Sequence, residues 1–188
     1  MEQKEYIDKA EKIYELIEKA HDKKVNFWIE NVVFTWQWWL GVLLTVVPWI
    51  LWFYLKKKES TYRLLCVGFF VIFISSWFDF IGISLGLWHY NYDVIPFLPS
   101  YLPWDFTILP VIVMFLIQFK ANFNPYFKAF IFAGGSAFIG EPIFVWIKTY
   151  APEQWKYLYS FPIFFFIYLI AHFISTRKEF DSLNKKLD

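Results

Sequence analysis

Five long apolar runs constrain this chain more than any other feature. They cover roughly residues 36–55, 64–87, 106–119, 127–150 and 157–175. A helix needs about 20 apolar residues to cross the hydrocarbon core of a bilayer, and only the third run needs its flanking residues to reach that length. We therefore predict an all-α, polytopic membrane helical bundle of about five transmembrane helices, which together make a transmembrane domain over residues 35–176.

The composition excludes a soluble domain of this size. Of the 188 residues, 58% are apolar, and a small globule needs more polar residues than that to cover its surface. The first residues lack the basic segment and short apolar core of a cleavable signal peptide, so we expect the chain to insert through its own spans. Cys66 is the only cysteine, which excludes an internal disulfide or a cysteine-based metal site.

The N-terminal segment, residues 1–34, is expected to form an amphipathic helix. Its apolar residues follow a spacing of four and three among Glu and Lys, which places them on one helical face; they are Tyr6, Ala10, Ile13, Ile17 and Ala20. Such a helix lies on a membrane surface or against a protein partner. A solvated helical tail fits the same pattern, because the apolar stripe is narrow and two of its members are alanine.

The distribution of Lys and Arg predicts the orientation in the cell membrane. In a five-span arrangement most of them fall on one side: Lys56, Lys57, Lys58, Arg63, Lys120, Lys128, Arg177, Lys178, Lys185 and Lys186. The loops on the other side hold Lys148 and Lys156. By the positive-inside rule the tail of residues 177–188 is cytoplasmic and the N-terminal helix lies outside, although the six lysines of that helix argue against this.

Three carboxyl groups within or beside the apolar runs are the candidate catalytic residues: Asp79, Asp105 and Glu141. An ionisable side chain in hydrocarbon is costly, so each marks a candidate site. Gly82 and Gly86 follow Asp79 on the same helical face and predict a small-xxx-small surface for the close approach of another helix. Asp79 should therefore face protein and not lipid.

Glu141 precedes Pro142 in the fourth run. A proline has no N–H, so the carbonyl of Phe138 is left as a free acceptor beside the carboxylate. If the second and fourth spans meet directly, Asp79 and Glu141 become neighbours that share a proton or line a small polar cavity.

Asp105 follows Pro103 and Trp104 at the start of the third run. The first interpretation of such a carboxylate is a helix cap, and a cap can also line a pocket. His172 in the fifth run is expected to be a buried or interfacial histidine, because a single histidine makes no metal site.

The sequence contains none of the motifs of nucleotide, dinucleotide or zinc-hydrolase sites. We therefore expect no cofactor and no metal. The basic residues lie in loops and mark topology, so we expect no nucleic-acid partner. The expected partners are the lipid bilayer, a lipid or isoprenoid ligand, and a protein that binds the N-terminal helix.

One motif carries a resemblance to known families. It runs Asp79-x-x-Gly82-x-x-x-Gly86-x-Trp88-x-Tyr90, followed by a proline-rich loop and Pro103-Trp104-Asp105. With this motif, and with Pro48 and the Glu141-Pro142 pair, the chain resembles a family of small uncharacterised integral membrane proteins from spore-forming Gram-positive bacteria. That resemblance implies a fold but no activity.

About a third of the chain is also similar to the lycopene cyclase domain of carotenoid enzymes. The resemblance implies an isoprenoid substrate and acids that supply a proton for ring closure. Members of that family have two adjacent acids where this chain has Trp104-Asp105, so one acid of the pair is absent here.

Three functions remain open from the sequence. The first is an interaction or structural role, because no motif is an unambiguous catalytic constellation. The second is an enzyme that acts on a lipid or isoprenoid, with Asp79, Asp105 and Glu141 as catalytic acids. In that hypothesis the substrate is bound by Trp88, His89, Tyr90 and Trp104, since aromatic walls attract a cationic intermediate. The third is a transporter of a small solute or protons that uses the same acids.

Overall fold

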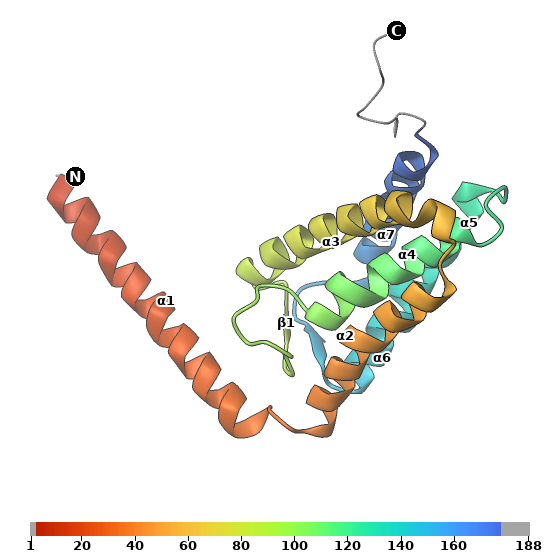
Figure 1. Cartoon of the computed structure of the whole chain (residues 1–188). Coiled ribbons are helices and arrows are strands. Elements are labelled where there is room, and N and C mark those ends of the chain that lie inside the picture. The colour runs from red at the N-terminus through yellow and green to blue at the C-terminus, as the bar shows by residue number, and fades with distance from the viewer. Residues whose placement is uncertain (1–2, 178–188) are drawn as a thin grey trace, which may run out of the picture.

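The computed structural model describes residues 3–177, and it confirms the all-α class. Its helices are α1 (Gln3–Asn31), α2 (Trp36–Leu55), η1 (Lys58–Ser60), α3 (Thr61–Ser84), η2 (Trp104–Ile108), α4 (Leu109–Gln118), α5 (Pro125–Gly135), η3 (Ser136–Gly140), α6 (Glu141–Trp146) and α7 (Tyr157–Thr176). Two short strands, β1 (Trp88–Tyr90) and β2 (Tyr150–Pro152), pair antiparallel. Helices α2 to α7 form the bundle, and α1 stands apart from it (Figure 1).

Four stretches of helix are long and apolar enough to cross a membrane, where the sequence predicted about five. They are 36–55, 58–84, 125–146 and 157–176. The third predicted span instead forms a shorter apolar helix over Trp104–Gln118. At 1.5 Å per residue, this helix covers only about 22 Å of a hydrocarbon core of about 30 Å.

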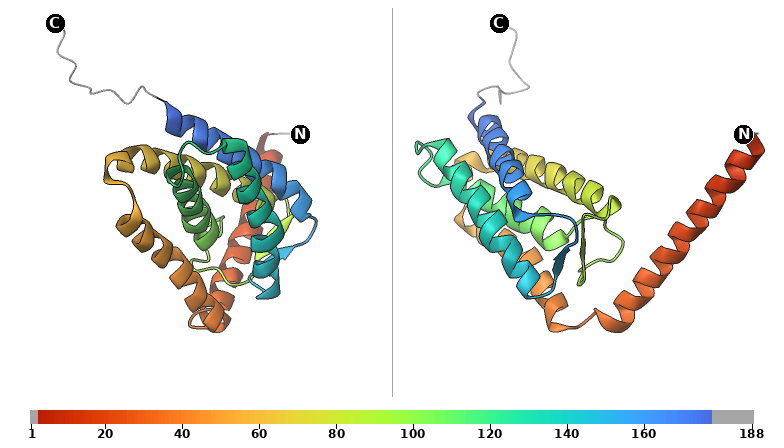
Figure 2. Two further views of the ribbon diagram at one scale, coloured as in Figure 1. Left: turned by 90° about the vertical axis from the view of Figure 1, so that its right-hand side faces the viewer. Right: turned by 180° about the vertical axis from the view of Figure 1, so that it is seen from behind.

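The short helix lies in the middle of the bundle, which explains why it is apolar on all sides. It contacts α2, α3, α5 and α7, and Figure 2 shows the other helices around it. Six of the ten residues of α4 are buried: Leu109, Pro110, Val111, Val113, Met114 and Ile117. A helix surrounded by protein does not have to match the thickness of the hydrocarbon.

At one end of the bundle the chain leaves its helices to form the two strands, and we call this the strand end. The second and fourth apolar runs were predicted to be helical as far as residues 87 and 150, but α3 ends at Ser84 and α6 at Trp146. Gly86 and Lys148 have φ angles of 67° and 62°, outside the range of a right-handed helix. Each lies two residues before its strand, so two backbone turns of the same kind make the strand end.

Two π-helical turns, η2 and η3, interrupt the third and fourth runs. Each is closed by a residue whose N–H bonds to the carbonyl five positions back. The closing residue is followed directly by a proline, Pro110 after η2 and Pro142 after η3. Proline provides no N–H for the next bond of the helix, so both turns expose carbonyl groups. Asp105 lies within the first turn and Glu141 closes the second.

Helix α1 is an arm with no buried residue. It leaves the strand end at a steep angle to the other helices (Figures 1 and 2). The link to α2 turns at Phe34, whose φ is 65°, and Thr35 caps α2 by accepting a hydrogen bond from the Trp38 N–H.

The opposite end of the bundle carries most of the basic residues that lie outside α1 in the described part of the chain, and we call it the tail end. Of the predicted tail, 177–188, all but Arg177 lies outside the described residues. Lys128 is buried, although the sequence suggests a loop charge. Its ammonium group donates to the carbonyls of Leu116, Phe119 and Lys120 at 2.7, 2.6 and 3.0 Å. Lys128 therefore caps the last turn of α4.

Candidate functional site

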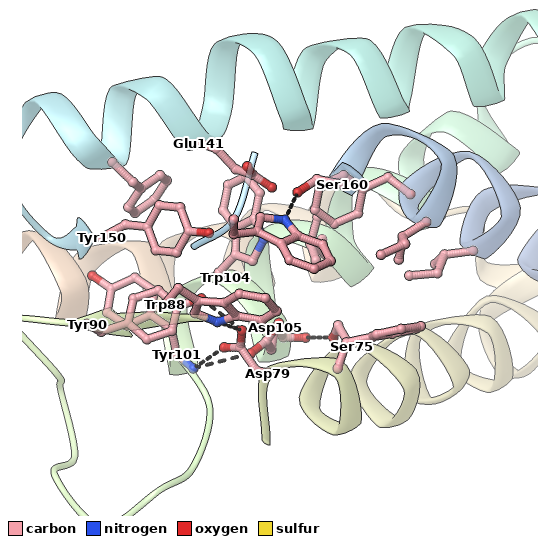
Figure 3. A pocket seen from close by; sticks show the side chains of 17 residues that line it. Ser75, Asp79, Trp88, Tyr90, Tyr101, Trp104, Asp105, Glu141, Tyr150 and Ser160 are labelled. Carbon is pink, nitrogen blue, oxygen red and sulfur yellow. Dashed lines mark hydrogen bonds between the residues drawn. The ribbon is translucent and has the colours of Figure 1, made fainter. Parts of the chain in front are cut away.

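One cavity near the strand end brings together all three candidate acids (Figure 3). Its volume of about 70 Å³ is the space of about two water molecules in the liquid. Asp79 comes from α3, Asp105 from η2 and Glu141 from α6, and all three are buried. The remaining walls are mostly aromatic and aliphatic: Ser75, Phe78, Trp88, Tyr90, Tyr101, Trp104, Leu109, Phe144, Tyr150, Trp155, Ser160, Ile163, Phe164 and Ile167.

Asp79 is held by three donors from the segment that follows its helix. Its Oδ1 accepts from the Trp88 indole at 2.9 Å and from the Tyr90 hydroxyl at 3.0 Å. Its Oδ2 accepts from the backbone N–H of Tyr101 at 2.9 Å. These bonds fix the carboxylate and tie α3 to β1 and to the loop before η2.

Asp105 is the nearest acidic neighbour of Asp79. Its Oδ2 accepts a hydrogen bond from the same Tyr101 N–H, at 3.2 Å, so the two carboxyl groups lie side by side. The sequence suggested that Asp79 would be paired with Glu141. Helices α3 and α6 share no substantial contact, and η2 provides the neighbouring acid instead. Two like charges this close in a buried site favour one shared proton.

Pro110 leaves two backbone carbonyl groups near Asp105 without a helical hydrogen-bond donor. The carbonyl oxygens of Asp105 and Phe106 lie five and four residues before this proline, which has no N–H to offer them. The Ser75 hydroxyl, which donates to the Val71 carbonyl at 2.8 Å, lies 3.3 Å from the first, and the Trp49 indole donates to the second at 2.9 Å. The capping interpretation is wrong, because no side chain of the described residues caps the start of η2. Asp105 instead accepts from the Tyr101 N–H, which precedes the helix, and lines the cavity.

Glu141 lies across the cavity from the two aspartates (Figure 3). Its Oε2 is buried and has no hydrogen-bond partner among residues 3–177. Ser160 lines the same cavity, and its hydroxyl accepts from the Trp155 indole at 2.8 Å. A buried carboxyl group without a cationic partner favours the neutral, protonated form.

Two glycines make room for the aromatic walls. A Cβ at position 82 would overlap the ring of Trp88, and a Cβ at position 140 would lie 2.6 Å from the ring of Trp104. The sequence predicted that another helix would pack closely on Gly82. This is wrong, because the indole ring of Trp88 packs there instead. Gly86 has open space around it and serves the turn.

Tyr90 separates the cavity from a second hollow. Its ring stacks on Tyr101 with centroids 4.5 Å apart. Burial, followed by the neighbouring Asp79, raises the pKa of the Tyr90 hydroxyl, so this group remains a proton donor. On its other side Tyr90 lines a groove of about 450 Å³ between α1 and the segment after β1.

The structure places His89 away from these residues. Neighbouring strand residues point to opposite faces, so His89 turns outward while Trp88 and Tyr90 turn inward. Its Nδ1 lies 3.6 Å from Glu153 Oε1 at the surface. His172 lies near the tail end, stacked on Tyr168, and its buried Nδ1 has no partner in the described part of the chain.

Several lining residues gave no functional signal in the sequence. Tyr101 and Trp155 were recognisable only as aromatic anchors of the membrane interface. Ser75 and Ser160 are serines in apolar runs, and no spacing distinguishes them. Within residues 3–177, no group of three His, Cys, Asp or Glu side chains is arranged to hold a metal ion.

Comparisons with known proteins give no parallel for this cavity. No protein-family model, curated protein or solved structure matches the chain. The resemblances described above therefore stay predictions, and the cavity is the main indication of function.

Proposed function

We propose that the chain is a multi-pass protein of the cell membrane, with its C-terminus in the cytoplasm and α1 outside. The four apolar helices support the membrane placement. The basic residues near the tail end support the orientation, among them Lys56, Lys57 and Arg63. In this arrangement the acidic cavity lies in the outer half of the bilayer. The short helix Trp104–Gln118 forms a fifth, buried element of the transmembrane bundle.

We propose further that the cavity is the active site of an enzyme that moves protons on an unsaturated lipid, with an isoprenoid as the favoured substrate class. The observation that carries this proposal is the convergence of Asp79, Asp105 and Glu141, from three separate elements, on one aromatic-walled cavity. General acid–base catalysis requires such positioned carboxyl groups. The local similarity to the lycopene cyclase domain agrees with this chemistry.

The three acids have different surroundings, and this suggests different roles. Glu141 lacks a hydrogen-bond partner on Oε2 and is the proposed donor of a proton to a carbon of the double bond. The carbocation that results is attracted to the faces of Trp88, Trp104 and Phe144. The Asp79–Asp105 pair carries one negative charge and accepts a proton from a neighbouring carbon. The substrate gains one proton and loses one, so the step is an isomerisation or cyclisation without oxidation and needs no cofactor. Transfer of a proton from the aspartate pair to Glu141 then restores the enzyme.

The substrate would enter between α3 and α7. Phe78 and Ile163 line the cavity from these helices, and the Phe78 side chain is 40% exposed on the outside of the bundle. With about 70 Å³ free, an isoprenoid segment fits only if side chains at this rim rotate. The rim faces the acyl chains of the proposed membrane, so an apolar substrate reaches it without crossing water.

A structural or interaction role is the second candidate. It is favoured by the full hydrogen bonding of Asp79, which is also what a carboxylate that only fixes packing would show. The exposed apolar side chains of α1 favour an interaction role. In this alternative the cavity holds water and no substrate.

The two candidates are separated by the lipid and isoprenoid content of cells that produce the protein. Mass spectrometry would compare cells without the protein and cells with wild type, Glu141→Gln or Glu153→Gln. The last is a matched control, because the same chemical change is made at an exposed residue outside the cavity.

The enzyme proposal expects a product in wild-type and Glu153→Gln cells that is absent with Glu141→Gln, at equal protein abundance and thermal stability. Identical lipid profiles in all four strains would reject it and favour the structural role.

A further inference from the structure

We infer that the apolar stripe of α1 binds the lipid surface beside the bundle at its strand end. The stripe is the set of residues defined by the sequence, Tyr6, Ala10, Ile13, Ile17 and Ala20. Except for the half-buried Ala10, these side chains are exposed in the structure, and nothing in residues 3–177 covers them. The inference rests on the proposed membrane placement but not on the enzymatic activity.

The contacts of α1 with the bundle show which way the stripe points. Its spacing continues to Lys24, four residues after Ala20, and to Trp28, four residues further. Lys24 Nζ lies 2.8 Å from Asp93 Oδ2, and the Trp28 indole donates to the Asp93 carbonyl at 2.7 Å. In a continuous helix these residues share one face with the stripe. The stripe therefore points to the side of α1 on which the bundle lies.

The opposite face of α1 is acidic. Glu11, Glu15, Glu18 and Asp22 repeat at the same spacing of four and three and are all exposed. Rotated about half a turn from the stripe, they point away from the bundle. This arrangement suits an interfacial helix, whose charged face meets water and whose apolar face enters the boundary between headgroups and acyl chains.

The place where α1 joins the bundle matches the level of a membrane interface. Phe34, Trp36 and Trp39 directly follow the arm and are 72%, 59% and 49% exposed. Exposed aromatic rings at the start of a transmembrane helix anchor it at the headgroups. At 1.5 Å per residue the arm is about 43 Å long. It runs at a steep angle to the bundle helices (Figure 2), so its stripe can follow the lipid surface.

A protein partner is less well supported as the occupant. A helix that pairs with a second copy can point its apolar stripe to any side. Here the stripe points toward the apolar helices, and the link at Phe34 and the contacts of Asp93 hold it in that direction. Lipid is what lies on that side in the proposed orientation.

The experiment uses the full chain in vesicles of phosphatidylcholine and phosphatidylglycerol. A Cys66→Ala background removes the native thiol, and Ile17→Cys or Glu15→Cys then carries a polarity-sensitive fluorophore. These positions lie two residues apart on opposite faces of α1. Quenching would be measured with iodide in water and with a nitroxide attached to a lipid close to the headgroup.

We expect the label at position 17 to emit at shorter wavelength and to be quenched several-fold more strongly by the nitroxide lipid than the label at position 15. Iodide should quench position 15 and spare position 17. Ile13→Cys and Glu11→Cys repeat the test in case one label disturbs the helix.

Three outcomes would overturn the inference. Equal quenching of both labels by iodide would show an arm in water. Protection of position 17 from both quenchers would show a protein contact. Emission that depends on the number of chains per vesicle would show pairing with a second copy. None of them bears on the product assay for Glu141, so the two proposals fail separately.

Discussion

Asp79 and Asp105 accept hydrogen bonds from one and the same backbone N–H, that of Tyr101. A single donor between two carboxyl groups leaves one of them to be neutralised by a proton. Asp79 has two further donors, and the Tyr101 N–H lies closer to Asp79, at 2.9 Å, than to Asp105, at 3.2 Å. We therefore assign the negative charge to Asp79 and the proton to Asp105.

This assignment predicts unequal effects of the two amide substitutions. Asp105→Asn should change stability little, because the amide oxygen can still accept from Tyr101. Asp79→Asn should cost about 1–3 kcal/mol, because an amide nitrogen would face a donor. Thermal unfolding in detergent, followed by intrinsic tryptophan fluorescence, measures both. A larger loss for Asp105→Asn would reverse the assignment.

Gly82→Ala should damage the site by overlapping the ring of Trp88. The indole would lose its position against α3 and its bond to Asp79, with a cost of about 1–3 kcal/mol. Gly135→Ala is the matched control, since it adds the same methyl group to a helix with nothing within 4 Å. The control should be neutral or stabilising by up to about 1 kcal/mol. Equal melting temperatures for the two variants would contradict the close contact between Gly82 and Trp88.

Lys128→Met should destabilise the tail end of α4. The ammonium group donates hydrogen bonds to three carbonyl groups. Removal of this charged donor should lower the free energy of unfolding by about 1–3 kcal/mol. Lys120→Met is the control, because the side chain of Lys120 is exposed, and it should shift stability by less than about 0.5 kcal/mol. Hydrogen exchange should be faster in α4 of the Lys128 variant only. Unchanged exchange in α4 would show that Lys128 is no cap.

Tyr90→Phe should keep the stacked ring and remove one donor from Asp79. The expected cost is about 1.5–3 kcal/mol, since the acceptor is charged. Tyr92→Phe provides a comparison on the same segment, with no hydrogen bond of its side chain to Asp79. Thermal unfolding of both variants checks this. Equal effects would mean that the Tyr90 hydroxyl does not support the charge on Asp79.

The sequence predicted the helical class from the length and hydropathy of its apolar runs. From the cost of charge in hydrocarbon it predicted that Asp79 and Glu141 face protein or a polar cavity. It also placed most of the helical segments, because length and hydropathy are local properties. It did not predict that helix 104–118 lies inside the bundle. An apolar helix that faces lipid and one that is surrounded by protein have similar hydropathy. Hydropathy therefore does not show which helix lies inside the bundle.

The partner of Asp79 could not be derived from spacing either. It depends on the turns at Gly86 and Lys148 and on the loop that brings the Tyr101 N–H to α3. Pro110 and Pro142 were visible in the sequence, but their spacing does not show that the carbonyl of Phe106, before Pro110, accepts from the Trp49 indole of α2. His89 was predicted to bind substrate because it lies between Trp88 and Tyr90 in the motif. These two neighbours point into the cavity, but His89 does not.

The central claim, that Glu141 is a protonated acid in a cavity reached from the membrane, can be tested by chemical modification. Dicyclohexylcarbodiimide dissolves in membranes and adds to protonated carboxyl groups, and peptide mass spectrometry locates the adduct. The account predicts an adduct on Glu141 that disappears in Glu141→Gln, while a water-soluble carbodiimide modifies Glu153 and spares Glu141. If the membrane-soluble reagent leaves Glu141 unmodified in folded protein, or if the water-soluble one modifies it as readily as Glu153, the claim is contradicted.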